Sequence, residues 1–443
     1  MTMPSSWEQT TFGQVIRVIR NGYNAPQNKD GDGVAITRIE TIATGEIDLG
    51  RVGYGHGMPA EFRLTEGDIL FSHINSGKHI GKTAIVFAEH GALYHGINLL
   101  RLQLEAGVDP KFFEAQCRLM RLEGIFSLRA QHAVNQASLN QGAIKSFGIK
   151  MAPLPEQRRI VAKIDSLNCK SRRVRDHLDH IPRLVEKYKQ AVLAAAFRGD
   201  LTRQCSTERS QWVHAELAHV CDPRRPITYG VIKLGNEVPG GVPCLRTSNV
   251  RWLRIDVQGL KSISKTLSDE YHRTILSGDE VLVNVRGTLG GVAVVPASMS
   301  GWNVSREVAV APVDSRLVLP KYAAHWIAAS RSQQWLTRVE KGVAYTGINL
   351  EDLRKLPISY PPIDEQEQIV HRVEAAFAWI DRLSAEATSG HKLIDRLDQA
   401  ILAKAFRGEL VPQDPVDEPA SVLLERIKAE RDDALKQKRC GKG

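Results

Sequence analysis

Apolar residues recur every three or four positions along two long stretches of the chain. In the first stretch, residues 156–197, the apolar row comprises Ile160, Ile164, Leu167, Val174, Leu178, Ile181, Val185, Tyr188 and Val192, with Ser171 as its one polar position. In the second, residues 365–406, it comprises Ile369, Val373, Ala376, Ile380, Leu383, Ala387, Gly390, Ile394, Leu397 and Ile401. Spacing that alternates between four and three is the heptad pattern of a coiled coil. The pattern predicts two helices, each roughly 63 Å long at about 1.5 Å per residue.

Proline and glycine residues punctuate both predicted helices. Pro182 is expected to kink or interrupt the first helix, because proline has no backbone N–H and its ring clashes with the preceding turn. Ser389 and Gly390 form a weak point at nearly the same depth of the second helix. Gly199 and Gly408 stand where a helix ends with a left-handed residue, so we expect them to be C-terminal caps.

The chain contains a tandem duplication. The sequence AAAFRGDL ends at Leu201 and AKAFRGEL ends at Leu410, while PLPEQRRIV ends at Val161 and PIDEQEQIV ends at Val370, so both pairs lie 209 residues apart. The flanking segments match more loosely, which suggests a fixed scaffold that carries two variable modules. We divide the chain into a first globular unit (1–155), a first helical region (156–203), a second globular unit (204–363) and a second helical region with a tail (364–443).

Charge favours pairing between the two helices. Residues 156–203 carry 12 basic and 6 acidic side chains, whereas residues 364–410 carry 6 basic and 9 acidic ones. Opposite charge favours mutual association of two heptad seams. The alternative is that each helix meets an unrelated partner. If the copies are equivalent, a two-fold axis relates them, so the helices run antiparallel and the globular units stand at opposite ends of a rod.

Both globular units read as mixed α and β structure. Short β-rich runs bounded by glycine occur in each of them, GDILFSHI, TAIVFA and INLLRLQL in the first and GDEVLVNV, GVAVVPA and REVAVAPV in the second. An amphipathic aromatic run that suits a helix follows each set, KFFEAQCRLMRLEGIF and KYAAHWIAASRSQQWL. The predicted fold class is α+β, with two α/β domains separated by two long antiparallel helices and related by a pseudo-two-fold axis.

Composition narrows the class of protein and its partners. Across 443 residues the formal net charge is +9, which makes a polyanionic partner plausible. The six cysteines show no C-x-x-C spacing, which fits a reducing cytosol better than a disulfide framework or a zinc knuckle. The sequence has neither the long apolar run of a membrane span nor the layout of a signal peptide, so we expect a cytoplasmic protein.

Motifs of catalysis and cofactor binding are weak or missing. The segment GKHIGKT, residues 77–83, is one residue too short for a phosphate-binding loop and has Ser76 where the first glycine belongs. Pro361 and Pro362 suit the start of a helix, and nothing upstream resembles the glycine-rich motif of an amino-methylating enzyme. His177 and His180 could hold a metal one turn apart, but a solvated helix face is the simpler interpretation, because the second copy lacks both. We expect no catalytic residue, no metal and no cofactor in this chain.

Polar and basic loops recur at similar places in both globular units. Arg, Asn and Gln make bidentate contacts with guanine and adenine, and Lys, Ser and Thr commonly hold phosphates, so these loops suit double-stranded DNA. For any single residue, an ordinary exposed loop is the competing interpretation. The candidate DNA-binding residues are His73, Asn75, Lys78, Lys82, Arg129, Gln131, Asn135, Gln136, Asn140, Arg246, Ser248, Asn249, Asn284, Arg286, Thr288, Asn303, Arg306, Lys341, Tyr345 and Asn349.

The helix starts PLPEQRRIVAKID and PPIDEQEQIVHRV, the helix ends AVLAAAFRGDL and AILAKAFRGEL, and the tail EPASVLLERIKAERD resemble the specificity subunit of type I restriction–modification systems. The resemblance covers essentially the whole chain. It implies two target-recognition domains that each read one half of a split DNA sequence, and two conserved helical regions that act as spacer and docking surface. It also implies that two methyltransferase subunits and, through them, restriction subunits are partners, and that S-adenosylmethionine, ATP and Mg belong to those partners.

The helix ends supply candidate docking residues. Small side chains there would let a partner helix approach closely, although packing between the chain's own helices explains them equally well. The candidates are Ala194, Ala195, Phe197, Arg198, Ala403, Ala405, Phe406 and Arg407. We also expect the tail to form a short helix, from Ala420 to Lys438, that packs near the first unit. Two other functions stay open at this point, a self-contained restriction–modification enzyme and a protein-organising scaffold without base readout.

Overall fold

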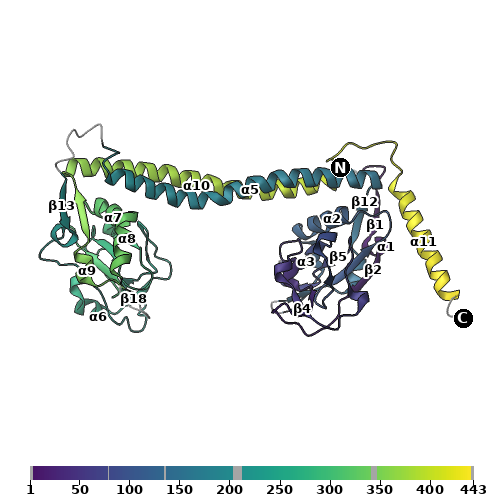
Figure 1. The fold of residues 1–443 in the computed structure, drawn as a ribbon, viewed down its shortest axis with the longest axis horizontal. Coiled ribbons are helices and arrows are strands. Elements are labelled where there is room, and N and C mark those ends of the chain that lie inside the picture. Colours follow the sequence, from purple (N-terminus) through teal and green to yellow (C-terminus); the bar gives the residue numbers. More distant parts are fainter. Residues whose placement is uncertain (1–2, 78, 134–135, 203–211, 341–346, 441–443) are drawn as a thin grey trace. The chain divides into compact units, whose positions relative to one another are not determined.

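The computed structural model describes residues 3–77, 79–133, 136–202, 212–340 and 347–440, and Figure 1 traces the chain. It divides into two compact units, which we call unit 1 (Met1–Leu178 with Ser389–Gly443) and unit 2 (Asp179–Thr388). Each unit is mixed α and β and includes part of both long helices, α5 (Leu154–Phe197) and α10 (Ile363–Ala405). None of the helices in this described part of the chain has the length and hydropathy of a membrane-spanning segment.

The main sheet of unit 1 is antiparallel, with strand order β2–β9–β5–β7. Its strands are β2 (Ile16–Asn21), β9 (Leu100–Leu104), β5 (Ile69–Phe71) and β7 (Thr83–Ile85). A second sheet has the order β4–β3–β8, in which β3 and β8 run parallel, and β1 pairs with β12. A further sheet joins β10, β11 and β6. These strands are β4 (Gly53–Gly55), β3 (Val34–Ile36), β8 (Leu93–Tyr94), β1 (Glu8–Thr11), β12 (Gly148–Met151), β10 (Gln131–Ala133), β11 (Gln136–Ser138) and β6 (Ile74–Asn75).

Unit 2 repeats this arrangement strand for strand in its main sheet, β14–β22–β19–β20. The strands are β14 (Thr228–Tyr229), β22 (Val308–Ala311), β19 (Val281–Asn284) and β20 (Val292–Val294). A second sheet, β18–β15–β21, again contains one parallel pair, and β13 pairs with β23. A hairpin of β16 and β17 is added. These strands are β18 (Lys261–Ile263), β15 (Val242–Leu245), β21 (Asn303–Val304), β13 (Val213–Glu216), β23 (Pro357–Tyr360), β16 (Val250–Arg251) and β17 (Arg254–Ile255).

In each unit the first helix after the main sheet packs on that sheet, α2 (Pro110–Leu122) on β7 and α7 (Pro320–Ala328) on β19 and β20, because it presents an apolar face to the strands. The long aromatic runs predicted from the sequence are helical, but each is divided in two, into α2 and α3 in unit 1 and into α7 and α8 in unit 2. The shorter helices are α1 (Phe12–Val15), α2 (Pro110–Leu122), α3 (Ile125–Arg129), α4 (Gln141–Lys145), α6 (Lys265–Glu270), α7 (Pro320–Ala328), α8 (Ser330–Val339) and α9 (Leu350–Arg354). The 3-10 turns are η1 (Ile39–Ile42), η2 (Leu49–Arg51), η3 (Ala60–Phe62), η4 (Ala88–His90), η6 (Leu217–Val220), η7 (His272–Thr274) and η8 (Ala297–Met299).

A buried glutamine fastens the start of each long helix to its unit. Gln157 Oε1 accepts from the backbone N of Asp109 at 2.9 Å, and Gln157 Nε2 donates to the carbonyl of Ala152 at 2.9 Å. Gln366 stands 209 residues later and bonds in the same way, to the N of Leu319 and the carbonyl of Pro361, both at 2.8 Å. Each glutamine therefore satisfies backbone groups at the start of α2 or α7, where a helix leaves its first N–H groups unpaired.

Each long helix ends on the helix that follows the main sheet. In unit 1 the ring of Phe406 lies edge-on to Phe112 of α2, with centroids 5.2 Å apart. In unit 2 the ring of Phe197 lies edge-on to Tyr322 of α7, with centroids 5.5 Å apart. Gly199 and Gly408 both have φ of 75°, which confirms them as the predicted C-terminal caps.

The two long helices run antiparallel within each unit. In unit 1, Arg175 Nη2 pairs with Asp395 at 2.9 Å and with Asp398 at 2.7 Å. In unit 2, Lys189 Nζ pairs with Asp381 at 2.5 Å, and the guanidinium of Arg372 donates to the carbonyl of Leu201. The helices therefore pair through opposite charges, as their composition predicts.

The predicted seam is wrong at four positions, Val174 and Tyr188 of α5 and Leu383 and Leu397 of α10. Val174 and Tyr188 are exposed, and the next residue in each case, Arg175 and Lys189, turns toward the carboxylates of α10. Of the kink or interruption predicted at Pro182, the interruption is wrong, because α5 stays helical through this residue. A proline removes one N–H and leaves one carbonyl, that of residue 178, without its helical donor.

The tail forms helix α11 (Ala420–Cys440), which packs on unit 1 as expected. Its residues Ala420, Leu423 and Ile427 are buried in the same core as the main sheet of that unit. Arg431 donates to the carbonyls of Gly13 and Gln14 at 2.8 and 3.0 Å. The tail therefore holds helix α1 in place.

Candidate nucleic-acid interface

In unit 2, several strand ends bring polar side chains to one place. The backbone N of Val285 donates to the carbonyl of Glu307 at 2.9 Å, which joins the end of β19 to the turn between β21 and β22. The backbone N of Arg306, in that turn, donates to the carbonyl of Val231 at 2.8 Å, just beyond β14. The candidates Arg286, Thr288, Arg306 and Ser248 are exposed here, and the Arg286 guanidinium lies 5.9 Å from the ring centre of Tyr229.

Three asparagines of unit 2 must be removed from the candidate list. Asn249, Asn284 and Asn303 are buried, and their Nδ2 groups donate to atoms of the same unit. Asn303 Oδ1 also accepts from Thr274 Oγ1 at 2.7 Å, and Asn249 Oδ1 accepts from the backbone N of Arg246 at 3.0 Å. An amide whose donors serve its own fold cannot reach a base edge, so the prediction is wrong for these three residues.

In unit 1, several candidates likewise serve the local fold. His73 is buried, and desolvation lowers its pKa below the ordinary value, so its ring is neutral near pH 7 and offers no charge to a phosphate. Lys82 Nζ donates to the carbonyl of Ala43, and Asn75 donates to Ser72 Oγ at 3.1 Å. Asn140 is exposed but caps α4 by accepting from the backbone N of residue 143 at 2.8 Å.

The remaining candidates are exposed, are partly exposed or lie outside the described residues. Arg129 and Gln131 of unit 1 and Asn349 of unit 2 are exposed, whereas Arg246 is partly buried and donates to the carbonyl of Gly259 at 3.0 Å. Lys78, Asn135, Lys341 and Tyr345 lie outside the described residues, and of Gln136 only the backbone is described. The exposed candidates are therefore Arg129, Gln131 and Asn140 in unit 1 and Ser248, Arg286, Thr288, Arg306 and Asn349 in unit 2.

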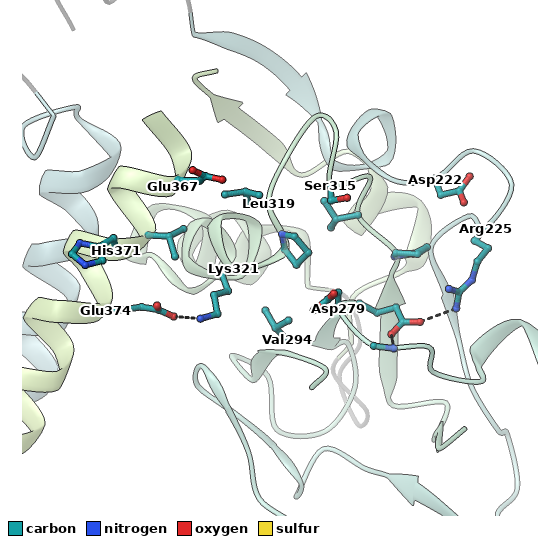
Figure 2. A pocket seen from close by; sticks show the side chains of 16 residues that line it. Asp222, Arg225, Asp279, Val294, Ser315, Leu319, Lys321, Glu367, His371 and Glu374 are labelled. Atoms are coloured by element: carbon teal, nitrogen blue, oxygen red, sulfur yellow. Dashed lines mark hydrogen bonds and ion pairs between the residues drawn. The ribbon is translucent and has the colours of Figure 1, made fainter. Parts of the chain in front are cut away.

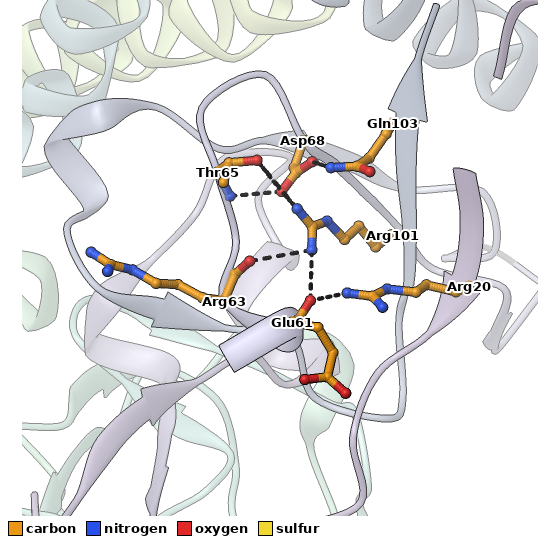
Figure 3. Close-up of polar contacts among 7 residues, drawn as sticks. All are labelled: Arg20, Glu61, Arg63, Thr65, Asp68, Arg101 and Gln103. Carbon is orange, nitrogen blue, oxygen red and sulfur yellow. Dashed lines mark hydrogen bonds and ion pairs between the residues drawn. The ribbon is translucent and has the colours of Figure 1, made fainter. Parts of the chain in front are cut away.

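One buried polar network fixes a loop of unit 1 and takes its charges out of reach (Figure 3). Arg101 Nη2 pairs with Asp68 at 2.5 Å, and both side chains are buried. Arg101 Nη1 donates to the carbonyls of Glu61 and Arg63 at 3.2 Å each, and Gln103 donates to Asp68 at 2.8 Å. Arg101 therefore holds the loop before β5 against the sheet and is not available to a nucleic acid.

The pocket in Figure 2 belongs to unit 2 and has about 590 Å³ of free volume. Its basic groups are already paired, Lys321 with Glu374 at 2.7 Å and Arg225 with Glu280 at 3.0 Å. Acidic side chains predominate in its lining, which includes Asp222, Asp279, Glu280, Glu367 and Glu374. Such a surface repels phosphates, so the pocket is not a nucleic-acid site. Within the described residues, no group of three or more His, Cys, Asp or Glu side chains is arranged to hold a metal.

Of the eight predicted docking residues at the helix ends, two are buried by the chain itself, three are half-buried and three are exposed. Ala405 and Phe406 are buried in the core of unit 1, where Ala403 also packs, and Phe197 packs against Tyr322 and Trp326. The prediction is therefore wrong for Ala405 and Phe406, because each helix end anchors its own unit. Ala194, Arg198 and Arg407 are exposed and Ala195 is half-buried, while the two arginines pair with Asp200 and Glu409.

Sequence reasoning missed two exposed apolar patches on the long helices. We use patch 1 for the exposed large apolar side chains of the two helices in unit 1, Val174, Leu393 and Leu397, and patch 2 for those in unit 2, Leu184, Tyr188, Trp379 and Leu383. Tyr188, Trp379 and Leu393 are 61%, 60% and 62% exposed, which is unusual for such large apolar side chains. Adding 209 turns Val174, Leu184 and Tyr188 into Leu383, Leu393 and Leu397, so the duplication relates the two patches.

The sequence of this repeated α/β chain is similar to sequences of known proteins. The family described as "Type I restriction modification DNA specificity domain" matches residues 227–387. The specificity subunit of the type I restriction enzyme EcoBI from Escherichia coli is 30% identical over 97% of this chain and 94% of its own length. A putative specificity subunit of enzyme MjaX from Methanocaldococcus jannaschii is 28% identical over 92% of this chain and 94% of its own length.

Solved structures show the same fold. A chain from a study of "complex assembly" and "conformational transition of the type I R-M system" superposes with a TM-score of 0.67, at 20% identity, over 92% of this chain and all of that chain. The HsdS subunit from Thermoanaerobacter tengcongensis superposes with a TM-score of 0.55, also at 20% identity, over 92% of this chain and 98% of that chain.

The fold and the match over nearly the full length define a class of non-catalytic DNA-specificity proteins. The chain belongs to the family of type I restriction–modification specificity subunits. Catalysis in these systems lies in other subunits, which agrees with the weakness of catalytic motifs in the sequence.

Proposed function

We propose that the chain recognises a two-part sequence in double-stranded DNA, with one part read by unit 1 and the other by unit 2. One observation carries the proposal: both units have the same order of strands in the main sheet, yet different side chains occupy the equivalent strand ends. Tyr229 of unit 2 corresponds to Asn21 of unit 1. Tyr229 pairs with Ala309 and Asn21 pairs with Leu100, and these two partners occupy equivalent positions on the neighbouring strand. Two copies of one scaffold with different side chains suit two different half-sequences.

The helix pair is proposed to form a coiled coil that sets the unread gap between the two halves. Both α5 and α10 contribute to both units, and each is continuous over its whole length. At about 1.5 Å per residue, helices of this length extend about 65 Å, a little under two turns of DNA at 34–36 Å per turn. A spacer of fixed length turns two short readouts into one long one, and linking the units raises the effective concentration of the second contact.

Two methyltransferase subunits are proposed to dock on the helix pair, one on each patch. Apart from Trp379, whose counterpart is Lys170, the duplication relates the residues of patch 1 to those of patch 2, which supports two copies of one partner. Exposed large apolar side chains that stand together in a patch mark interaction surfaces in water-soluble proteins. Restriction subunits would join through the methyltransferase subunits.

The cofactors of the reaction are proposed to lie in the partners. The methyltransferase subunits would bind S-adenosylmethionine, and the restriction subunits would use ATP and Mg. This chain would contribute only the choice of sequence, and it would do so in the cytoplasm, where the DNA lies.

A methylation map tests the proposed function. Genomic DNA is sequenced with base-modification detection from cells that contain the methyltransferase subunits with and without this chain. We expect methylated adenines in one two-part sequence, and only when the chain is present. Methylation within one continuous sequence block, or methylation that does not depend on the chain, would contradict the proposal and favour a scaffold without base readout.

A further inference from the structure

The exposed arginines at the strand ends of unit 2 are held in place by the backbone and have free side chains. Arg286 follows β19, and its backbone N donates to the carbonyl of Glu307 at 3.3 Å, while Arg306 is fixed through the carbonyl of Val231 at 2.8 Å. Among the described residues, neither guanidinium has an ion pair or a hydrogen bond. By contrast, Arg225 and Arg316 of the same unit pair with Glu280 and Asp314 at 3.0 and 2.6 Å.

An aromatic ring accompanies these arginines. The Arg286 guanidinium lies 5.9 Å from the ring centre of Tyr229, which is itself partly exposed. Glu307 is the acidic residue next to Arg306 in the turn, and the hydroxyl of Ser305 lies 3.4 Å from its carboxylate. A ring beneath the guanidinium restricts it without using its donors, so its bidentate fork stays available.

Strand register shows what stands at the same positions in unit 1. Ile74 pairs with Ser138 in the way that Arg286 pairs with Gly347. The following bonds agree, because Leu139 N donates to His73 O at 2.8 Å and Ile348 N donates to Val285 O at 2.7 Å. Arg286 of unit 2 therefore corresponds to Ile74 of unit 1.

The second arginine is also replaced in unit 1. Phe71 pairs with Leu100, and its counterpart Val283 pairs with Ala309. Counting back three residues from these partners gives Ile97 in unit 1 and Arg306 in unit 2. Isoleucines thus occupy both arginine positions, and Tyr229 is replaced by Asn21, which accepts from Gln141 Nε2 at 2.9 Å.

We propose that Arg286 and Arg306 read guanine in the half-sequence recognised by unit 2, and that the corresponding positions of unit 1, Ile74 and Ile97, do not read guanine. An arginine fork matches the O6 and N7 acceptors of guanine, which no other base presents together in the major groove. Unit 1 offers isoleucine side chains, which suit the thymine methyl group, and amides, which suit adenine. The inference rests on the proposed function and gives each half-sequence a chemical character.

The test uses complexes of the full chain with its methyltransferase subunits and DNA duplexes that carry the mapped sequence. Each guanine is replaced in turn by 7-deazaguanine, which lacks the N7 acceptor but still pairs with cytosine. We expect one replacement to weaken binding by the unaltered complex by a part of the about 5- to 150-fold cost of a whole bidentate contact, because O6 stays in place and only the N7 acceptor is lost. Arg286→Ala or Arg306→Ala weakens binding to the ordinary duplex by the cost of the whole contact and abolishes the cost of that one replacement.

Arg224→Ala is the matched control, because Arg224 is an exposed arginine of unit 2 near the other end of the main sheet, where its partner Asp222 donates from its backbone N to the carbonyl of Pro312, just beyond β22. In the complex with this control variant, each 7-deazaguanine replacement weakens binding by the same factor as in the unaltered complex. The inference is overturned if every 7-deazaguanine cost persists in both arginine variants, or if those variants lose affinity equally for all sequences, as a phosphate contact would. A target that is not in two parts would instead overturn the proposed function itself, so the two failures are distinguishable.

Discussion

At the scale of single residues, the sequence shows the chemical type of each side chain but not the direction in which the side chain points. Arginine and asparagine were both candidate base readers because both form bidentate contacts. Arg286 and Arg306 are exposed, whereas Asn284 and Asn303 point inward and bond to the turns around them. Asn is as well suited to satisfying a buried turn as to reading adenine, so its identity alone could not separate the two roles.

A buried histidine makes unit 2 sensitive to acid. His325 of α7 is buried edge-on against Phe377, and desolvation lowers its pKa from 6.5 to about 4, with Lys321 adding to the decrease and Glu374 opposing it. In the unfolded chain this histidine takes up a proton near pH 6.5, but in the folded unit it does so only near pH 4. We therefore expect stability to be complete above pH 6.5 and to fall between pH 6.5 and 4, with His325 accounting for up to about 3 kcal/mol.

His325→Phe tests this origin, because it keeps a ring edge against Phe377 and removes the titrating group. The free energy of unfolding is measured with denaturant at pH 7 and pH 5 for the parent, the variant and the control His272→Phe, whose histidine is exposed. His325→Phe should lose less stability between the two pH values than the parent, and the control should match the parent. His95 of unit 1, whose pKa is also lowered to about 4, leaves part of the acid loss in place. An identical loss in parent and His325→Phe would refute this assignment.

At the scale of elements, local signals predicted the long helices and their caps well. The repeat placed both helix ends, and glycine marked both caps because the left-handed conformation suits it. The heptad pattern failed at Val174 and Tyr188 of α5 and at Leu383 and Leu397 of α10, which are all exposed. After Val174 and Tyr188 a basic residue follows at once, and its long side chain turns to a carboxylate on α10. Periodicity counts apolar residues, and it could not show that an ion pair displaces them from the seam.

The patches give a prediction of stoichiometry. Tyr188→Asp in patch 2, or Leu393→Asp in patch 1, places a charge in one of two equivalent apolar surfaces. Loss of a central apolar contact costs about 2 kcal/mol or more, roughly a 30-fold loss of affinity. Each variant should therefore bind one methyltransferase subunit where the unaltered chain binds two, as measured by native mass spectrometry.

The control for this experiment is Glu386→Ala, which changes an exposed polar position of α10 and should leave two copies bound. The double variant with both patches altered should bind none. If both single variants still bind two copies with unchanged affinity, the patches are not the docking surface and the helix pair uses another face.

At the scale of the whole molecule, the duplication was the decisive sequence signal. Sequence segments that recur 209 residues apart predicted two units with corresponding strands. The two main sheets have the same strand order, which agrees with that prediction. The target sequence could not be predicted in the same way, because loops such as the one that carries Arg286 differ between units while the strands beneath them correspond. The spacing of apolar residues predicts the scaffold, whereas the choice of bases depends on a few side chains at strand ends.

The central claim is that two reading units are spaced by the helix pair, and lengthening that pair tests it most directly. Seven residues of heptad sequence are inserted into both helices where the units divide, after Leu178 and after Thr388, and a second variant receives 14 in each. Insertions of whole heptads preserve the seam. Each heptad adds about 10 Å of helix, which is the length of about 3 base pairs at 3.4 Å each.

Methylation maps of cells that carry each variant are compared with the map of the unaltered chain. The account predicts that both half-sequences stay the same while the gap between them grows by about 3 and then about 6 base pairs. An unchanged gap in a variant that still methylates DNA, or a changed half-sequence, would contradict it.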